Sequence, residues 1–122
     1  KDTTNMTSSQ EVIINVGDNI RDTLVGTLSS IIARSNIYKN NTLILSLGYS
    51  LDDNIKVSFR MCGNNEEYNL KEILQEIALK VGCEAGGHKF ACGCLIPREK
   101  EDSFIKNAIN ILSKRVMEEV VA

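Results

Sequence analysis

Residues 55–61 alternate strictly between apolar and polar side chains, and this alternation limits the fold more than any other feature of the chain. Lys56, Ser58 and Arg60 are the polar members, and the residues between them are apolar. Because successive side chains of a β-strand point to opposite faces of its sheet, the pattern predicts a strand that is buried on one face only. We therefore expect a β-sheet, and the polar face of this strand is available for binding.

Three other segments have the composition of strands. Residues 11–16 form a β-branched run that ends in a Gly-Asp-Asn turn, and residues 42–47 form an apolar run that is followed by glycine. Residues 90–96 are small or apolar and end before the only proline. Asp52 and Asp53 lie in the turn after the second run, where short acidic side chains favour a hairpin for local reasons. We interpret both aspartates as structural.

A first helix is predicted after residues 11–16. Its apolar positions recur at helical spacing and are Ile20, Leu24, Leu28, Ile31 and Ile32. Asp18 or Asn19 can cap the free amide groups at its start, whereas Gly26 is unfavourable in the middle of a helix.

Two more helices follow. Asn69 is a predicted N-cap with Glu72 three residues later, the next apolar face extends over residues 70–81, and Gly82 is suited to the C-terminal stop. A final helix is expected to turn one apolar face inward, and that face consists of Phe104, Ile105, Ala108, Ile109, Leu112 and Val116.

The order of these elements defines the expected fold class. Strand, helix, strand, strand, helix, strand and helix predict an α/β (α+β-like) fold, with a single mixed sheet of about four to five strands flanked by about three helices. A chain of 122 residues is sufficient for one domain with a core. Residues 1–10 are polar and are interpreted as a linker or boundary segment, and residues 11–122 as the domain, a fragment of a larger protein.

Net charge and cysteine content restrict the function classes. The formal net charge is −2, so any contact with a polyanion must be local. No apolar run approaches the ~20 residues that span a bilayer, and the N-terminus lacks a signal-peptide pattern, so we expect a cytoplasmic protein with no membrane partner. In that compartment the four cysteines are expected to be reduced thiols.

Residues 83–97 are the most informative candidate for a binding site. Gly86 and Gly87 leave peptide N–H groups unshielded, so a phosphate could be held there, with a hydrogen bond from His88 and a charge from Lys89. An ordinary turn before a strand also explains the two glycines, and a structural role also explains the histidine.

A second candidate is the polar face of residues 55–61. Ser58 and Arg60, with Lys56 as an auxiliary cation, are suited to phosphate contacts that position a strand without reading bases. A solvated outer face is the alternative interpretation.

Metal and redox chemistry have weaker support. Cys83, His88, Cys92 and Cys94 supply four plausible zinc ligands, but their spacing matches no common zinc motif, and we predict no metal site. The chain has no CxxC motif and no second histidine to act as a base for a nucleophilic cysteine, and we assign no catalytic residue.

The segments KVSFR, NLKEIL and GGHKFACGCLIP, followed by the closing helix, resemble the DHH-associated C-terminal domain of RecJ-type (DHH family) phosphoesterases, which are single-strand-specific exonucleases. The resemblance covers roughly residues 11–112. Ser58 and Arg60 match the family's strand motif, and the glycine-histidine motif is matched at residues 86–88. Lys89 departs from the usual proline and is a further candidate phosphate contact.

The same motif has other departures. Cys92 and Cys94 stand where the family commonly has alanine, whereas Ala91 and Gly93 match its small positions. A free thiol packs as a small hydrophobe, so the two cysteines are interpreted as packing residues.

The resemblance implies a division of labour. The matched residues are expected to hold substrate phosphate and sugar in one groove that contains Arg60 and His88. An N-terminal catalytic DHH domain of the same polypeptide is expected to hydrolyse phosphodiester bonds with manganese or magnesium, whereas this domain has no cofactor of its own. The expected partners are that catalytic domain and a single-stranded nucleic acid or oligonucleotide.

Several alternatives remain open. The domain could serve an oligoribonucleotide or small-phosphoester phosphatase, or it could be a non-catalytic RNA-binding domain, like the similar domains of alanyl-tRNA synthetases, or a protein-interaction domain. Homo-oligomerisation, the choice between DNA and RNA, and the polarity of digestion are not encoded in a readable motif. The richness in Ile, Asn, Lys and Glu suits an archaeal or bacterial genome.

Overall fold

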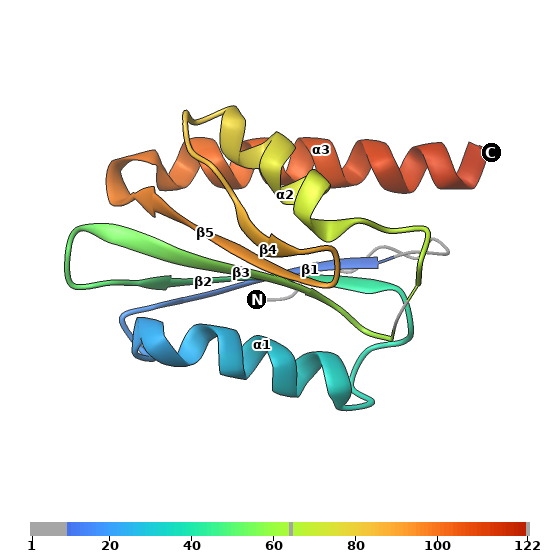
Figure 1. Ribbon diagram of the computed structural model, residues 1–122, viewed down its shortest axis with the longest axis horizontal. Helices are drawn as coiled ribbons and strands as arrows, with labels where there is room; N and C mark the ends of the chain where they lie inside the picture. The colour runs from blue at the N-terminus through green and yellow to red at the C-terminus, as the bar shows by residue number, and fades with distance from the viewer. Residues whose placement is uncertain (1–9, 64, 122) are drawn as a thin grey trace.

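The structure, a computed structural model, describes residues 10–63 and 65–121, with side chains described for 11–63 and 65–114. One five-stranded sheet has the order β1-β2-β3-β5-β4. Helix α1 covers one face of the sheet, and α2 and α3 lie on the opposite face (Figure 1). The predicted linker over residues 1–10 lies outside the described residues except for its last residue, which begins β1.

The elements follow one another in an order close to the predicted one. They are β1 (Gln10–Gly17), η1 (Asp22–Leu24), α1 (Val25–Arg34), β2 (Thr42–Tyr49), β3 (Asn54–Met61), α2 (Leu70–Leu79), β4 (Gly86–His88), β5 (Ala91–Pro97), η2 (Arg98–Lys100) and α3 (Glu101–Val121). Strands β1 and β2 are parallel, and every other pair of neighbouring strands is antiparallel. The predicted fold class is confirmed, and β4 is the one strand that was not predicted.

The alternation on β3 gives an apolar and a polar face as predicted, but the polar face is less exposed than expected, because Ser58 is buried and Lys56 and Arg60 are half-buried. Ile55, Val57, Phe59 and Met61 are buried in the main core, where they join residues from β2, β5, α2 and α3. The intervening side chains of β3 face α1. Burial of the apolar face removes side chains from water and supplies most of the stability of this layer.

Helix α1 packs on the sheet differently from the prediction. It begins at Val25 and has no side-chain cap from Asp18 or Asn19, because a turn and the short helix η1 come first. Leu24 and Ile31 are 50% and 56% exposed, so the predicted apolar face is wrong at these positions.

The face of α1 that meets the sheet is small and polar. The buried residues of α1 are Val25 and Ser29, and Ser29 Oγ donates a hydrogen bond to Ser46 Oγ of β2 at 2.6 Å. A Cβ atom at Gly48 would lie only 2.5 Å from Val25 Cγ2. The helix can therefore approach β2 closely because Gly48 has no side chain.

The later helices largely agree with the sequence pattern. Asn69 Oδ1 accepts a hydrogen bond from the backbone N–H of Glu72 at 3.2 Å, and Gly82 adopts a φ of +76° after α2. These observations confirm the predicted cap and stop.

Helix α3 turns a slightly different face inward. Phe104, Ala108 and Leu112 are buried as predicted, but Ile109 is 50% exposed and Ile111 is buried in its place. The buried positions recur every three or four residues from Phe104, and Ile109 falls between them. The side chain of Val116 lies outside the described residues. None of the described helices is long and apolar enough to cross a membrane.

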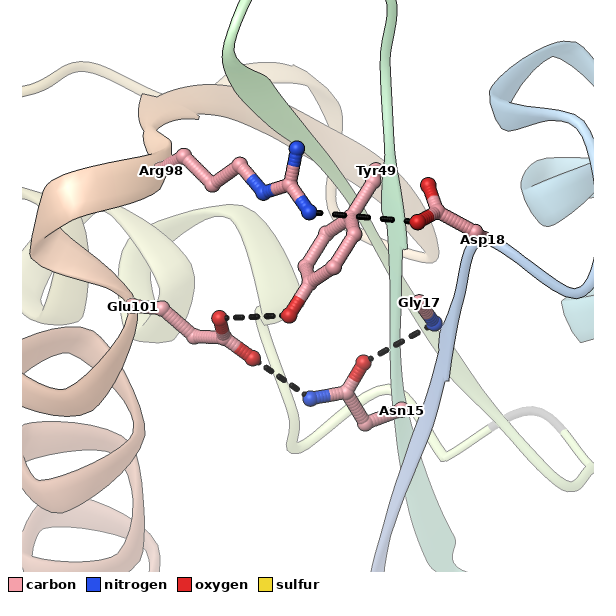
Figure 2. Close-up of polar contacts among 6 residues, drawn as sticks. All are labelled: Asn15, Gly17, Asp18, Tyr49, Arg98 and Glu101. Atoms are coloured by element: carbon pink, nitrogen blue, oxygen red, sulfur yellow. Dashed lines mark hydrogen bonds and ion pairs between the residues drawn. The ribbon is translucent and has the colours of Figure 1, made fainter.

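A polar network joins the start of α3 to the ends of β1 and β2 (Figure 2). Glu101 accepts hydrogen bonds from Asn15 Nδ2 at 2.7 Å and from the Tyr49 hydroxyl at 2.9 Å. The guanidinium of Arg98 stacks on the Tyr49 ring at 3.8 Å and lies 3.9 Å from a carboxylate oxygen of Asp18. The pKa of the Tyr49 hydroxyl is raised mainly by its hydrogen bond to Glu101, with a smaller contribution from desolvation.

Candidate functional site

A groove of about 560 Å³ runs along the face of the sheet that carries α1. Helix α1 packs mainly against β2 and β3, which leaves the part of this face that belongs to β5 and β4 largely uncovered by it. The groove lies between the helix and these two strands, and β3 forms its floor. Lys56, Ser58 and Arg60, the three polar residues of the alternating strand, all line this groove.

Arg60 is held in place by contacts on three sides. Its Nε donates to Ser30 Oγ at 3.4 Å, and its Nη1 donates to the carbonyl oxygens of Phe59 at 3.0 Å and Cys92 at 3.2 Å. A Cβ atom at Gly26 would lie 3.8 Å from Nη2. The contacts with β5 and α1 fix the guanidinium group, and no protein acceptor is recorded for Nη2 among the described residues.

The far wall of the groove consists of small residues of β4 and β5, among them Gly86, Gly87, Ala91 and Gly93. Gly87 has a φ of +115°, and an added Cβ would lie 2.5 Å from the carbonyl oxygen of Ala91. An added Cβ at Gly93 would lie 2.5 Å from the carbonyl oxygen of Val57. The fold itself therefore requires glycine at both positions.

Gly86 differs from these two glycines. An added Cβ would meet no atom within 4 Å, so packing does not exclude a larger residue there. The residue lines the groove opposite α1. Its backbone is therefore open to a group that approaches from the groove.

Helix α2 positions this glycine segment. Gln75 Oε1 accepts a hydrogen bond from the backbone N–H of Ala85 at 2.7 Å, and the backbone N–H of Leu70 donates to the carbonyl oxygen of Lys89 at 2.8 Å. Both ends of β4 are thus fixed to the helix on the other face of the sheet.

His88 lies at the edge of the groove. Its strand partner is Ala91, which lines the groove, and paired residues of antiparallel strands share a face, so the exposed His88 side chain lies on the groove face. On the other side of β5, Phe59 of β3 pairs with Cys92, so Arg60, the next residue of β3, lies near Ala91. Arg60 and His88 are therefore two strands apart, with roughly 10 Å between their backbones. His88 is not among the residues that line the groove itself.

Lys89 is directed elsewhere. Its ammonium group pairs with the carboxylate of Glu66 and lies 5.3 Å from the centroid of the Phe90 ring. It does not line the groove. The structure therefore brings Lys56, Ser58, Arg60, Gly86 and Gly87 together in one groove, with His88 at the edge and Lys89 outside, and the predicted roles in phosphate binding stay predictions.

The groove has an unusual charge composition for this chain. Its lining includes Arg34, Lys56 and Arg60 but no Asp or Glu, although the chain as a whole carries 16 acidic and 14 basic residues. Within the described ranges, none of these three cations makes an ion pair with a carboxylate. Lys89 and Arg98, which do form ion pairs, lie outside the groove. The lining of the groove therefore has a local excess of positive charge.

One wall of the groove consists of residues that the sequence analysis did not identify as site residues. It consists of Thr23, Gly26, Thr27, Ser30 and Arg34, all from η1 and α1. The four polar members recur at intervals of four, three and four residues, which is a helical stripe. The helical spacing of these polar residues could be recognised in the sequence, but only the packing of α1 on the sheet shows that they face the groove.

Two of the cysteines, both in β5, are packing residues of the core. Cys92 and Cys94 are buried in the core, and burial raises the pKa of the Cys92 thiol to about 11 and that of Cys94 to about 12. Arg60 and Lys71 act in the opposite direction on Cys92. Among the residues that the structure describes, no group of three or more His, Cys, Asp or Glu side chains is placed to hold a metal ion.

Comparison with known proteins identifies the family. Residues 9–114 match the DHHA1 domain, and the chain belongs to this family. DHHA1 domains typically accompany DHH phosphoesterases as domains that bind phosphate or nucleic acid. A search of curated proteins found no match.

Solved structures share the fold. The C-Ala domain of Aquifex aeolicus alanyl-tRNA synthetase is 12% identical, with a TM-score of 0.63 over 95% of this chain and 97% of that domain. A structure described as a member of the s1p family of ribosomal proteins, DHH domain, is 20% identical, with a TM-score of 0.63 over 92% of this chain. The matched region is 27% of that second protein. At these identities the likeness shows a common fold.

Proposed function

We propose that this chain is the substrate-binding domain of a RecJ-like, single-strand-specific phosphoesterase, and that its groove binds the phosphates of a nucleic-acid strand. The observation that carries the proposal is the groove's charge: among the described residues its lining has three cations that form no ion pair and has no carboxylate, in a chain with a net charge of −2. A site with this composition favours a polyanion through local charge.

The individual groups are suited to a phosphate. The Nε and Nη1 groups of Arg60 are held by protein acceptors, and Nη2, which has no acceptor among the described residues, is left to donate charged hydrogen bonds to a phosphate oxygen. The hydroxyl of Ser58 and the open backbone at Gly86 supply neutral hydrogen bonds nearby. None of these contacts reads a base, so the groove orients a strand without selecting its sequence.

The chemistry belongs to another domain in this proposal. Hydrolysis by two metal ions needs several acidic and histidine ligands around ions about 3.5–4 Å apart, and this chain has a single histidine. We assign Mn²⁺ or Mg²⁺ binding and catalysis to an N-terminal DHH domain of the same polypeptide. The groove contributes by holding the strand in position against that centre, because positioning alone lowers a reaction barrier.

The proposal predicts weak and salt-sensitive binding by this chain alone. Only a few phosphates can be neutralised by three cations, and the logarithm of the binding constant is expected to fall by roughly 0.7 per phosphate contact for each unit of log salt concentration. The test is a fluorescence titration of the chain with labelled single-stranded DNA and RNA at low salt.

Three variants make that titration specific. Arg60→Gln removes the central groove charge, His88→Ala removes the edge histidine, and Lys106→Gln removes an exposed charge from α3 on the opposite face of the sheet. We expect Arg60→Gln and His88→Ala to lower affinity by about tenfold or more and the α3 variant to bind like the native chain. Equal binding by all four folded proteins would contradict the proposal.

A further inference from the structure

The polar stripe of α1 extends the cationic groove past Arg60. Thr23, Thr27, Ser30 and Arg34 all line the groove from one side of the helical segment. The eleven residue steps from Thr23 in η1 to Arg34 at the end of α1 span about 16 Å at the rise of a helix. This wall is therefore longer than a single phosphate group requires.

Arg34 lies at the far end of this wall. Ser30, four residues before it, accepts a hydrogen bond from Arg60 Nε at 3.4 Å, so Arg34 continues the line of positive charge about 6 Å farther along the helix axis. Arg34 is exposed, and in the part of the chain that the structure describes it forms no ion pair with a carboxylate.

A cation in the last turn of a helix also has a purely structural explanation. Arg34 is the last residue of α1, where a positive charge interacts favourably with the helix dipole. That explanation accounts for a basic residue at the end of α1 but not for an acid-free wall that leads to it. The two explanations predict different effects of substitution, because a dipole contact affects stability and a ligand contact affects binding.

We propose that Arg34 forms a second phosphate subsite, next to the one at Arg60, and that the groove therefore binds oligonucleotides with consecutive phosphates in preference to single phosphate esters. The inference rests on the proposed function for Arg60 and adds a residue that sets the preferred length of the ligand. The threonines and serine of the same stripe supply hydroxyl groups along the path between the two ends.

The experiment compares ligands that differ in their number of phosphates. The native chain, Arg34→Gln, Arg34→Lys, Arg60→Gln and Lys106→Gln are titrated at low salt with thymidine 5′-monophosphate and with 5′-phosphorylated thymidine oligonucleotides of two and six residues. Urea unfolding of each variant measures stability in parallel.

The subsite predicts a specific pattern. Arg34→Gln weakens binding of the six-residue ligand by about tenfold and lowers its salt slope by roughly 0.7, and it leaves binding of the monophosphate unchanged. Arg34→Lys, which retains the charge, recovers most of the affinity. Arg60→Gln weakens binding of every ligand, and Lys106→Gln matches the native chain.

Other outcomes separate the two proposals. If Arg60→Gln weakens binding and Arg34→Gln matches the native chain for every ligand, the groove binds phosphate but the second subsite is rejected. The same holds if Arg34→Gln lowers only the stability, because that result identifies a helix-dipole contact. If Arg60→Gln also binds all ligands like the native chain, the proposed function itself fails.

Discussion

The two faces of β3 consist of alternating residues of one strand, yet they meet opposite surroundings. Val57 and Phe59 are fully buried against the layer of α2 and α3, whereas Lys56 and Arg60 face a groove that α1 leaves open. On the first face the side chains contribute to the core, and on the second they are available to a ligand. The comparison shows that this domain separates stability from binding at the level of single residues.

The separation also extends to the neighbouring strand. Cys92 and Cys94 of β5 are part of the core, and Gly93 between them lies on the groove face, where its missing side chain allows close contact with the carbonyl oxygen of Val57. On β5, the larger side chains therefore lie on the core face, and the groove face has a residue without a side chain.

The largest expected contrast comes from neighbouring positions of β3. Phe59→Ala removes a fully buried ring and should lower the free energy of unfolding by about 3–5 kcal/mol. Lys56→Gln, on the groove face, should change it by no more than about 0.5 kcal/mol. Urea unfolding monitored by circular dichroism measures both, and losses of similar size would contradict a division between the two faces.

Two adjacent glycines give the next contrast. Gly87→Ala places a Cβ 2.5 Å from the carbonyl oxygen of Ala91 at a φ of +115°, and should cost about 2 kcal/mol or more. Gly86→Ala meets no atom within 4 Å, so the stability should be nearly unchanged while the methyl group occupies space beside the ligand. Chemical unfolding and oligonucleotide titration of both variants provide the readouts. A destabilised Gly86→Ala variant would show that this glycine also serves the fold.

The buried thiols predict a loss of stability at alkaline pH. The pKa of Cys94 is raised from 9.0 to about 12, mainly by burial, so the unfolded chain releases this proton at lower pH than the folded one. This contribution is complete below pH 9 and is lost as the pH rises toward 12, with a slope of at most about 1.4 kcal/mol per pH unit.

Comparison with Cys94→Ala isolates that contribution from other alkaline titrations. The variant is expected to be less stable than the native chain at pH 8, and the difference should shrink as the pH approaches 10.5. Parallel unfolding curves at several pH values measure it. A difference that stays constant with pH would mean that the thiol titrates alike in both states.

The smallest expected effect lies at the entrance of α1. A Cβ at Gly26 would be 3.8 Å from Arg60 Nη2 and 3.9 Å from Ser58 Oγ, which is ordinary contact. Gly26→Ala should therefore stabilise the helix by a few tenths of a kcal/mol, up to about 1 kcal/mol, and should weaken binding because the methyl group lies beside the guanidinium. Thermal unfolding and the same titration test this, and tighter binding would place the phosphate elsewhere.

The core face could be predicted because its signals are local. The alternation over residues 55–61 and the cap formed by Asn69 each depend on a few adjacent residues, and both are confirmed. Strand β4 has only three residues and two of them are glycine, so it has no pattern of its own and exists through its pairing with β5.

The groove face could be predicted only in part. Lys56, Ser58 and Arg60 follow from the alternation, but the wall of α1 depends on how that helix is rotated against the sheet. The rotation is set by the close approach of Val25 to Gly48 and by the hydrogen bond between Ser29 and Ser46. These are contacts between residues far apart in the sequence, so no local pattern reveals them. Hydrophobicity alone would place Leu24 against the sheet, but its side chain is exposed.

The most direct test of the account is to map where a nucleic acid touches the folded chain. An NMR titration of the ¹⁵N-labelled protein with a short single-stranded oligonucleotide reports on each backbone amide. We expect chemical-shift changes at the backbone amides of Ser30, Ser58 and Gly86, which surround the groove, and little change at the exposed surface of α2 and α3. Shifts concentrated on those two helices, with the groove amides unchanged, would contradict the claim that the groove face binds nucleic acid.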